Sequence, residues 1–139
     1  MTAPATAPTT VEIRVIFGDT DQMGIVYYAN YLRFFEAGRG ALLRERGRSY
    51  KDIEARGFQM PVTEAHVRYI RPARYEDVLV VTTRIEAVRG ASMRFGYLIS
   101  RDGEIVAEGF TEHACLGENG RPTRIPQELR DLLAGTAGV

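Results

Sequence analysis

One helical segment followed by four strand segments with short connections constrains the fold of this 139-residue chain more than any other feature. Apolar residues recur every three or four positions from residue 30 to about 46, which predicts an amphipathic helix. Strands are predicted, from their valine, isoleucine and threonine content, over residues 11–17, 59–70, 78–88, 92–100 and 105–116. Consecutive strands with short connections pair antiparallel. The sequence therefore predicts an α+β fold in which one long helix covers a five-stranded antiparallel sheet.

Cap and turn residues set the limits of these segments. Asn30 is expected to cap the N-terminus of the long helix, and Gly47 its C-terminus. Shorter helices are predicted over residues 49–56 and 127–133. Alanine, threonine and proline dominate residues 1–10, which predicts a flexible N-terminal arm. The remainder, residues 11–135, is expected to form a single domain.

The long helix combines a core-facing pattern with two internal glycines. Its predicted face consists of Leu32, Phe35, Arg39 and Leu42, with Tyr31, Phe34 and Gly38 beside it. Gly38 and Gly40 should each weaken the helix by ~1 kcal/mol relative to alanine. Close packing of the helix against the sheet would explain them, and glycines without a packing role are the alternative.

Composition excludes several classes of function. Eighteen basic residues balance eighteen acidic ones, so no broad attraction to nucleic acid is expected. No apolar run approaches the length of a transmembrane segment, and the first residues lack the features of a signal peptide. Cys115, the single cysteine, is expected to be buried in a strand. A lone thiol favours a reducing, cytoplasmic location.

Metal and cofactor chemistry also lack sequence support. The two histidines, His66 and His113, lie far apart and are expected to be partly buried structural residues in strands. With one cysteine they form no recognisable metal-ligand spacing. Neither a nucleophile elbow nor a phosphate-binding loop occurs. We therefore predict no metal site and no cofactor.

The densest polar segment, Asp19-Thr20-Asp21, lies between the first strand and the long helix. Hydrogen bonding to turn backbone is an ordinary role for such aspartates. However, the apolar run 24–28 leads directly from this segment into a helix N-terminus. Unpaired backbone N–H groups there carry the positive end of the helix dipole and stabilise a developing oxyanion. A carboxylate beside such groups is sufficient for acyl hydrolysis.

This segment belongs to a longer motif. Its residues are Arg14-Val15 and, after four more positions, Thr20-Asp21-x-x-Gly24-Ile25-Val26-x-Tyr28-x-x-Tyr31. The motif resembles the signature of 4-hydroxybenzoyl-CoA thioesterases and the related YbgC-type bacterial acyl-CoA thioesterases. Similarity extends through residues 34–39 and 67–77 and covers roughly residues 11–127. The resemblance implies the hotdog fold, in which an antiparallel sheet wraps a long helix.

The resemblance also implies roles for individual residues. Asp21 would be the nucleophile or general base, and the backbone N–H of Tyr28 would polarise the thioester carbonyl, with Gly24 in the same catalytic loop. Asp19 would be structural. Some hotdog thioesterases use a glutamate on the central helix, which makes Glu36 the alternative catalyst. Arg39 lies three residues further on and could instead pair with Glu36.

Coenzyme A binding in this family uses the turn before the fourth strand. Here that turn contains Arg89, Gly90 and Ser92, where Arg89 could pair with phosphate and Gly90 would let backbone approach it. Arg121 and Arg124, in the loop before the last helix, are expected to add positive charge, and solvated surface arginines are the alternative. The implied substrate is an acyl-CoA, and the implied assembly is a homo-oligomer, either a dimer or a dimer of dimers (a homotetramer). A partner subunit is expected to complete the site.

Two other functions stay open from the sequence. The chain could be a non-catalytic acyl-CoA-binding hotdog protein, although Asp21 argues against that. A hotdog hydratase or dehydratase would use a histidine with an acid, and neither histidine is near the long helix in sequence. The acyl group is also open, either aromatic or short to medium aliphatic. Aromatic residues that could line its pocket or belong to the core are Tyr27, Tyr28, Tyr31, Phe34, Phe58 and Tyr69.

Overall fold

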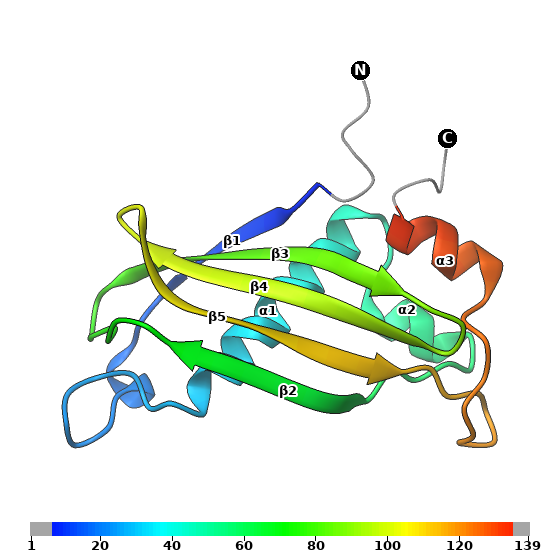
Figure 1. Ribbon diagram of the computed structural model, residues 1–139, viewed down its shortest axis with the longest axis horizontal. Coiled ribbons are helices and arrows are strands. Elements are labelled where there is room, and N and C mark those ends of the chain that lie inside the picture. Colours follow the sequence, from blue (N-terminus) through cyan, green and yellow to red (C-terminus); the bar gives the residue numbers. More distant parts are fainter. Residues whose placement is uncertain (1–6, 135–139) are drawn as a thin grey trace.

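The computed structural model describes residues 7–134 as one five-stranded antiparallel sheet that curves around a long helix (Figure 1). Residues 1–6 of the predicted arm and residue 135 of the predicted domain lie outside the described residues. The strands are β1 (Thr9–Arg14), β2 (Val62–Tyr69), β3 (Val78–Val88), β4 (Ser92–Arg101) and β5 (Glu104–Ala114). The helices are α1 (Asn30–Glu45), α2 (Tyr50–Ala55) and α3 (Gln127–Ala134). The predicted α+β fold class is confirmed.

The order of strands across the sheet is β1-β3-β4-β5-β2 (Figure 1). Val81 of β3 stands opposite Ile99 of β4, and Ile99 stands opposite Ala107 of β5, so apolar side chains align in a row. All three are fully buried. The register therefore places one continuous apolar face against α1, as inward and outward side chains alternate along each strand.

Several strand limits differ from the sequence prediction, most of all those of β1 and the start of β2, where strand pairing begins or ends at other residues. β1 begins at Thr9, since Thr9 and Thr10 pair with β3, and it ends at Arg14 before the short 3-10 turn Phe17–Asp19. β2 begins at Val62 and not at residue 59, because Gln59 forms only an isolated bridge with Leu116 beyond the end of β5.

The predicted cap at the N-terminus of α1 is wrong, and the predicted cap at its C-terminus is confirmed. Asn30 is the first helical residue and not the cap, because its side-chain amide donates to the Asp19 carbonyl (2.9 Å). Gly47 does terminate the helix, with φ +93° and with its N–H donated to the Arg44 carbonyl (3.0 Å). Arg48 N–H donates to the Leu43 carbonyl (3.0 Å), which completes a Schellman ending.

The core face of α1 is rotated slightly from the predicted one. Phe34, Phe35 and Leu42 are fully buried, whereas Leu32 is 41% exposed. Gly38 packs directly on β3, because a Cβ atom there would lie 2.9 Å from Val81 Cγ1 and closer still to Thr83 Oγ1. The close-packing explanation therefore holds for Gly38.

Strand β2 forms an edge of the sheet. Among residues 7–134 it pairs with β5 alone, so its other side is unpaired. Its side chains are exposed except for half-buried Val67. His66 is therefore exposed and not partly buried as predicted, and its ring stacks on Phe110 (5.5 Å between centroids). An unpaired strand edge can pair with another strand of the same kind.

Candidate active site

Asp21 stands at the base of a compact loop, residues 20–29, which we call the Asp21 loop. Asp21 N–H donates to the Ile25 carbonyl (2.9 Å), and Gly24 N–H donates to the Asp21 carbonyl (2.9 Å). Gly24 has φ +79°, a conformation that favours glycine. Asp21 Oδ1 accepts from Met23 N–H (2.8 Å), while Oδ2 has no hydrogen-bond partner among the described residues. The half-buried carboxylate is thus fixed on one oxygen and free on the other.

Asp19, two residues earlier, holds this loop in place. Its side chain is buried, accepts from Ile16 N–H (2.9 Å) and pairs with Arg33 of α1. Its carbonyl accepts from Tyr27 N–H (2.9 Å) as well as from Asn30. Asp19 therefore has the structural role that the sequence predicted for it.

The Asp21 loop ends in the first turn of α1. Tyr28 and Ala29 precede the helix, and within residues 7–134 neither of their N–H groups has a hydrogen-bond partner. The Tyr28 carbonyl, in contrast, accepts from the hydroxyl of Tyr69 (2.8 Å) at the end of β2. The helix end thus presents free donors at a position fixed by β2, as anion-stabilising helix ends do.

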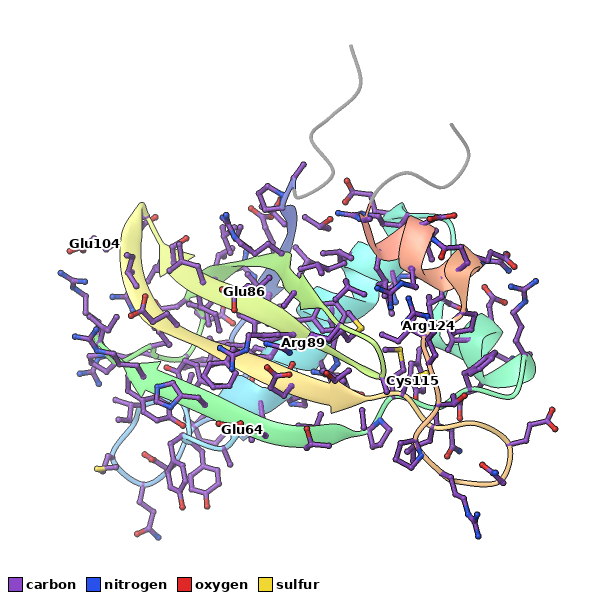
Figure 2. All side chains as sticks on the ribbon, turned by 45° about the vertical axis from the view of Figure 1, so that its right-hand side comes forward. Glu64, Glu86, Arg89, Glu104, Cys115 and Arg124 are labelled. Carbon is purple, nitrogen blue, oxygen red and sulfur yellow. The ribbon has the colours of Figure 1, made fainter. Side chains whose placement is uncertain are left out.

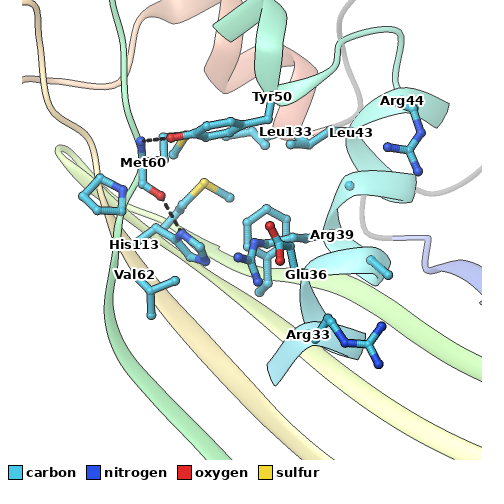
Figure 3. Close-up of a pocket in the computed structure, with 15 residues that line it drawn as sticks. Arg33, Glu36, Arg39, Leu43, Arg44, Tyr50, Met60, Val62, His113 and Leu133 are labelled. Atoms are coloured by element: carbon cyan, nitrogen blue, oxygen red, sulfur yellow. Dashed lines mark hydrogen bonds between the residues drawn. The ribbon is translucent and has the colours of Figure 1, made fainter. Parts of the chain in front are cut away.

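A cavity of about 620 Å³, which we call the α1 cavity, lies between the middle of α1 and the sheet (Figure 3). Its apolar lining includes Leu43, Met60, Val62, Met93, Phe95 and Leu133. Its polar lining includes Glu36, Arg39, Tyr50 and His113. Gly40 also lines it, because its missing side chain leaves room that only the flexible end of Arg44 approaches. Neither Asp21 nor Tyr28 lines this cavity.

His113 enters the α1 cavity from β5 and faces the α1 side chains (Figure 3). The sequence argument that no histidine is near the long helix is therefore wrong, because the sheet brings residue 113 back to it. Both ring nitrogens are engaged, Nδ1 with the Met60 carbonyl (2.9 Å) and Nε2 with Thr111 Oγ1 (2.8 Å). Burial lowers the pKa of His113 below its usual 6.5. His113 is therefore a neutral structural residue and not a free catalytic base.

Glu36 and Arg39 both line the α1 cavity, but no ion pair joins them in the described part of the chain. Arg39 instead donates a long hydrogen bond to the Tyr97 hydroxyl (3.5 Å). Glu36 is exposed, and Arg39 is half-buried. The predicted pairing of these two residues is therefore not found.

The structure brings the four predicted coenzyme A residues together at the β3–β4 turn. Arg89 N–H donates to the Ser92 carbonyl (2.8 Å), and Ile125 N–H ties the Arg124 segment to the Gly90 carbonyl (2.9 Å). Arg89 and Arg124 lie at the same end of the sheet (Figure 2). The Arg89 guanidinium is already paired with Glu112 (3.1 Å), which leaves Arg124 as the more available cation.

Glu112 binds two arginines on the sheet, Arg89 and Arg94. Burial raises the pKa of the Glu112 carboxyl, but hydrogen bonds and charge from both arginines outweigh burial and lower it. This cluster stabilises the turn that carries Gly90.

The Asp21 loop and the β3–β4 turn lie at opposite ends of the molecule (Figure 1). Within one chain, the predicted catalytic and coenzyme A residues therefore do not meet. No group of three or more potential metal ligands occurs among the described residues. The described helices are also all too short or too polar to cross a membrane.

The sequence signalled the Asp21 loop but not the α1 cavity. Its polar residues come from α1, α2 and β5, and no motif joins them in sequence. Of the six aromatic candidates for the acyl pocket, none lines this cavity. Tyr31 and Phe34 are core residues, whereas Tyr27, Tyr28 and Tyr69 are exposed around the Asp21 loop. Alternation along β5 was the available signal, because it points Thr111 and His113 to the same face as α1.

Comparisons with known proteins agree with this architecture. Residues 15–133 match the thioesterase-like superfamily. The acyl-CoA thioester hydrolase YbgC of Escherichia coli is 37% identical over 119 residues, covering 84% of this chain and 89% of its own length.

Two solved structures are similar over the whole described fold. A hypothetical protein of Thermus thermophilus superposes with a TM-score of 0.88 at 35% identity, covering 91% of this chain and 98% of its own. The DHNA-CoA thioesterase of Staphylococcus aureus superposes with a TM-score of 0.84 at 31% identity, covering 90% and 85%. The chain therefore belongs to the thioesterase-like superfamily and is a hotdog-fold thioester hydrolase.

Proposed function

We propose that this enzyme hydrolyses acyl-CoA thioesters, with Asp21 as nucleophile or general base and the Tyr28 N–H as the donor to the thioester oxygen. One observation carries this proposal: a carboxylate with a free oxygen shares a ten-residue loop with two unpaired N–H groups at the start of α1. The charge of Asp21 reaches this loop's aromatic residues. The pKa of Tyr27 is raised chiefly by its neighbour Tyr28, with a smaller contribution from Asp21.

In the proposed reaction, the carbonyl oxygen binds at the Tyr28 N–H, where developing negative charge is stabilised. Either Asp21 attacks the carbonyl carbon, expels the thiolate of coenzyme A and forms an anhydride that water opens, or Asp21 takes a proton from an attacking water. Both routes yield a carboxylate and coenzyme A. Coenzyme A is part of the substrate, so the reaction needs no cofactor.

The proposed site is completed by a second copy of the chain. Val62, at the start of β2, lines the α1 cavity, whereas Tyr69, at the end of β2, binds the Asp21 loop. Two copies paired antiparallel through their free β2 edges would set each Val62 beside Tyr69 of the partner subunit. That arrangement brings the partner's Asp21 to the mouth of the α1 cavity. We therefore propose a homodimer, or a dimer of dimers, with two composite sites per dimer.

The same pairing supports the predicted coenzyme A contacts. Met93, directly after the β3–β4 turn, lines the α1 cavity. Gly90 and Arg124 therefore lie at the same end of the molecule as this cavity. A thioester held between the partner's Asp21 and the cavity could extend its coenzyme A moiety toward this turn. A reducing, cytoplasmic location suits the free buried thiol of Cys115.

A thiol-release assay with a panel of aromatic and aliphatic acyl-CoAs tests the activity. We expect turnover by the wild type and a loss of at least about a hundredfold in Asp21→Asn, which keeps the shape but not the charge. Binding of coenzyme A by this variant should be retained, and Glu36→Gln is the matched control at the alternative carboxylate. Near-normal hydrolysis by Asp21→Asn would refute the assignment. A wild type that binds acyl-CoA without releasing thiol would make the chain a non-catalytic binder.

Single turnover in heavy-oxygen water tests the anhydride route. Label recovered in the Asp21 carboxylate indicates the anhydride, because only water attack on the Asp21 carbonyl of that anhydride places label there. Label found only in the product carboxylate excludes water attack on the Asp21 carbonyl.

A further inference from the structure

Arg39 occupies an unusual place for an arginine. It is half-buried, it lines a largely apolar cavity, and within residues 7–134 no carboxylate lies within 4.0 Å of its guanidinium. Buried arginines are normally paired with an acid. Its one hydrogen bond in the described structure is the long one to Tyr97 (3.5 Å), so most of its five N–H donors have no partner among residues 7–134.

The hydrogen bonds behind Arg39 have a fixed direction. The Met60 carbonyl can only accept, so His113 donates from Nδ1 and, being neutral, accepts at Nε2 from the Thr111 hydroxyl. Thr111 Oγ1 then accepts from the Tyr97 hydroxyl (2.6 Å), which leaves the Tyr97 oxygen to accept from Arg39. This series of hydrogen bonds supplies Arg39 with a neutral acceptor but no negative charge.

The other charged residues of the α1 cavity do not neutralise Arg39. Arg33 is already paired with Asp19 outside the cavity. Glu36 and Arg44 also line the cavity, but both are exposed, so water screens their charges, and their opposite signs cancel. A net positive charge therefore remains inside an apolar cavity, at Arg39.

We propose that Arg39 selects acyl groups that carry a carboxylate at the end remote from the thioester. This inference rests on the proposed function, because the acyl group must enter the α1 cavity from the composite site. The methylene chain of such a dicarboxylic acyl group packs against Met60, Met93 and Phe95. Its terminal carboxylate pairs with the guanidinium fork of Arg39, which the Tyr97 hydroxyl holds in position.

Adipoyl-CoA and hexanoyl-CoA test this selection, because they have equal chain length and differ only in the terminal carboxylate. We expect the wild type to have the higher kcat/KM with adipoyl-CoA. Arg39→Met, which keeps the stem and removes the charge, should lower kcat/KM for adipoyl-CoA about tenfold to a hundredfold and leave hexanoyl-CoA unchanged. The kcat/KM of Arg39→Lys with adipoyl-CoA should lie between those of the wild type and Arg39→Met, because lysine keeps the charge but not the planar fork of donors.

The matched control is Lys51→Met, which removes an exposed positive charge on α2 outside the cavity. It should not change the ratio of the two kcat/KM values. Binding of both probes to the Asp21→Asn variant, measured by calorimetry, provides a readout without turnover, in which Arg39→Met should weaken only adipoyl-CoA.

Two results would overturn the selection while leaving the proposed hydrolysis intact. One is a wild type that turns over hexanoyl-CoA at least as well as adipoyl-CoA. The other is an Arg39→Met variant, or Arg39→Lys if the methionine variant does not fold, that loses both substrates equally. Absence of any Asp21-dependent thiol release would instead refute the proposed function.

Discussion

The Asp21 loop and the α1 cavity offer different things to a substrate. The loop has a carboxylate and free backbone donors, but it is largely exposed, and neither Asp21 nor Tyr28 lines the α1 cavity. The cavity encloses about 620 Å³, yet its histidine is neutral and doubly hydrogen-bonded, and its glutamate is exposed. Reactive groups and a binding volume are thus separated within one chain. This separation is the reason for proposing a site assembled from two copies.

The largest effect is expected from mixing two defective chains. Asp21→Asn removes the loop's carboxylate, and Gly40→Phe places a ring in the cavity that Gly40 lines, where the three atoms nearest to an added Cβ belong to Arg44. Each variant alone should be inactive. Co-expressed with different tags, they should regain about one quarter of wild-type activity, because half of randomly formed dimers are mixed and each of these has one intact site.

Thiol-release rates of the co-expressed mixture check this expectation, and the mixed dimer purified through both tags should have about half of the wild-type activity. Gly40→Ala in place of Gly40→Phe is the control and should stay active. Activity that remains at background in the mixed dimer would show that the loop and the cavity act within the same chain.

A second, smaller effect concerns the two glycines of α1. Gly38→Ala should lower the free energy of unfolding by about 2–3 kcal/mol, because its Cβ would overlap Val81 and Thr83. Gly40→Ala should raise it by about 0.5–1 kcal/mol, because the helix gains alanine's propensity and the nearest atom to the new Cβ, at 3.2 Å, belongs to the flexible end of Arg44, which can move aside. Denaturant unfolding measures both. Adding Thr83→Ala to Gly38→Ala should recover part of the loss, and equal effects of the two alanines would contradict the assigned packing.

Tyr69→Phe tests how firmly β2 holds the loop. Its hydroxyl donates to the Tyr28 carbonyl, so its loss should lower kcat about twofold to tenfold with little change in KM. Tyr75→Phe is the matched control, because the Tyr75 hydroxyl makes no hydrogen bond with any described residue. An unchanged kcat in Tyr69→Phe would mean that the Tyr28 backbone keeps its position without this contact.

The smallest expected effect is a pH dependence of stability from His113. Its pKa is lower in the folded chain than the usual 6.5 because of burial, so between these values only the unfolded chain binds a proton. The free energy of unfolding should therefore fall as pH falls below about 6.5. His113→Gln should flatten this slope in thermal unfolding series. A slope that is unchanged in the variant would assign it to other groups.

Local patterns predicted the elements well. Helix α1, strand β3 and the Gly47 ending follow from periodicity, β-branched content and the special backbone of glycine, which act over a few residues. The Asp21 loop was equally accessible, because its carboxylate, glycine and helix start are contiguous in sequence. The role of Asn30 was not accessible in this way. Its side chain binds the Asp19 carbonyl and does not cap the helix, and only the folded loop creates that contact.

Residues that meet across the sheet were beyond local reasoning. His113 lies far beyond the end of α1 along the chain, yet antiparallel pairing returns it to the α1 cavity. His66 was expected to be partly buried, but its strand is at the edge of the sheet. Strand order decides both outcomes, and strand order depends on long-range pairing.

The sequence by itself determined the α+β class, the position of the long helix and the loop that carries Asp21, because each depends on neighbouring residues. Only the tertiary structure decided that the α1 cavity exists, that no carboxylate of residues 7–134 lies within 4.0 Å of the Arg39 guanidinium there, and that the Asp21 loop and the Gly90 turn lie at opposite ends. The physical reason is that enclosure, charge compensation and distance between sites arise from packing between segments far apart in the chain.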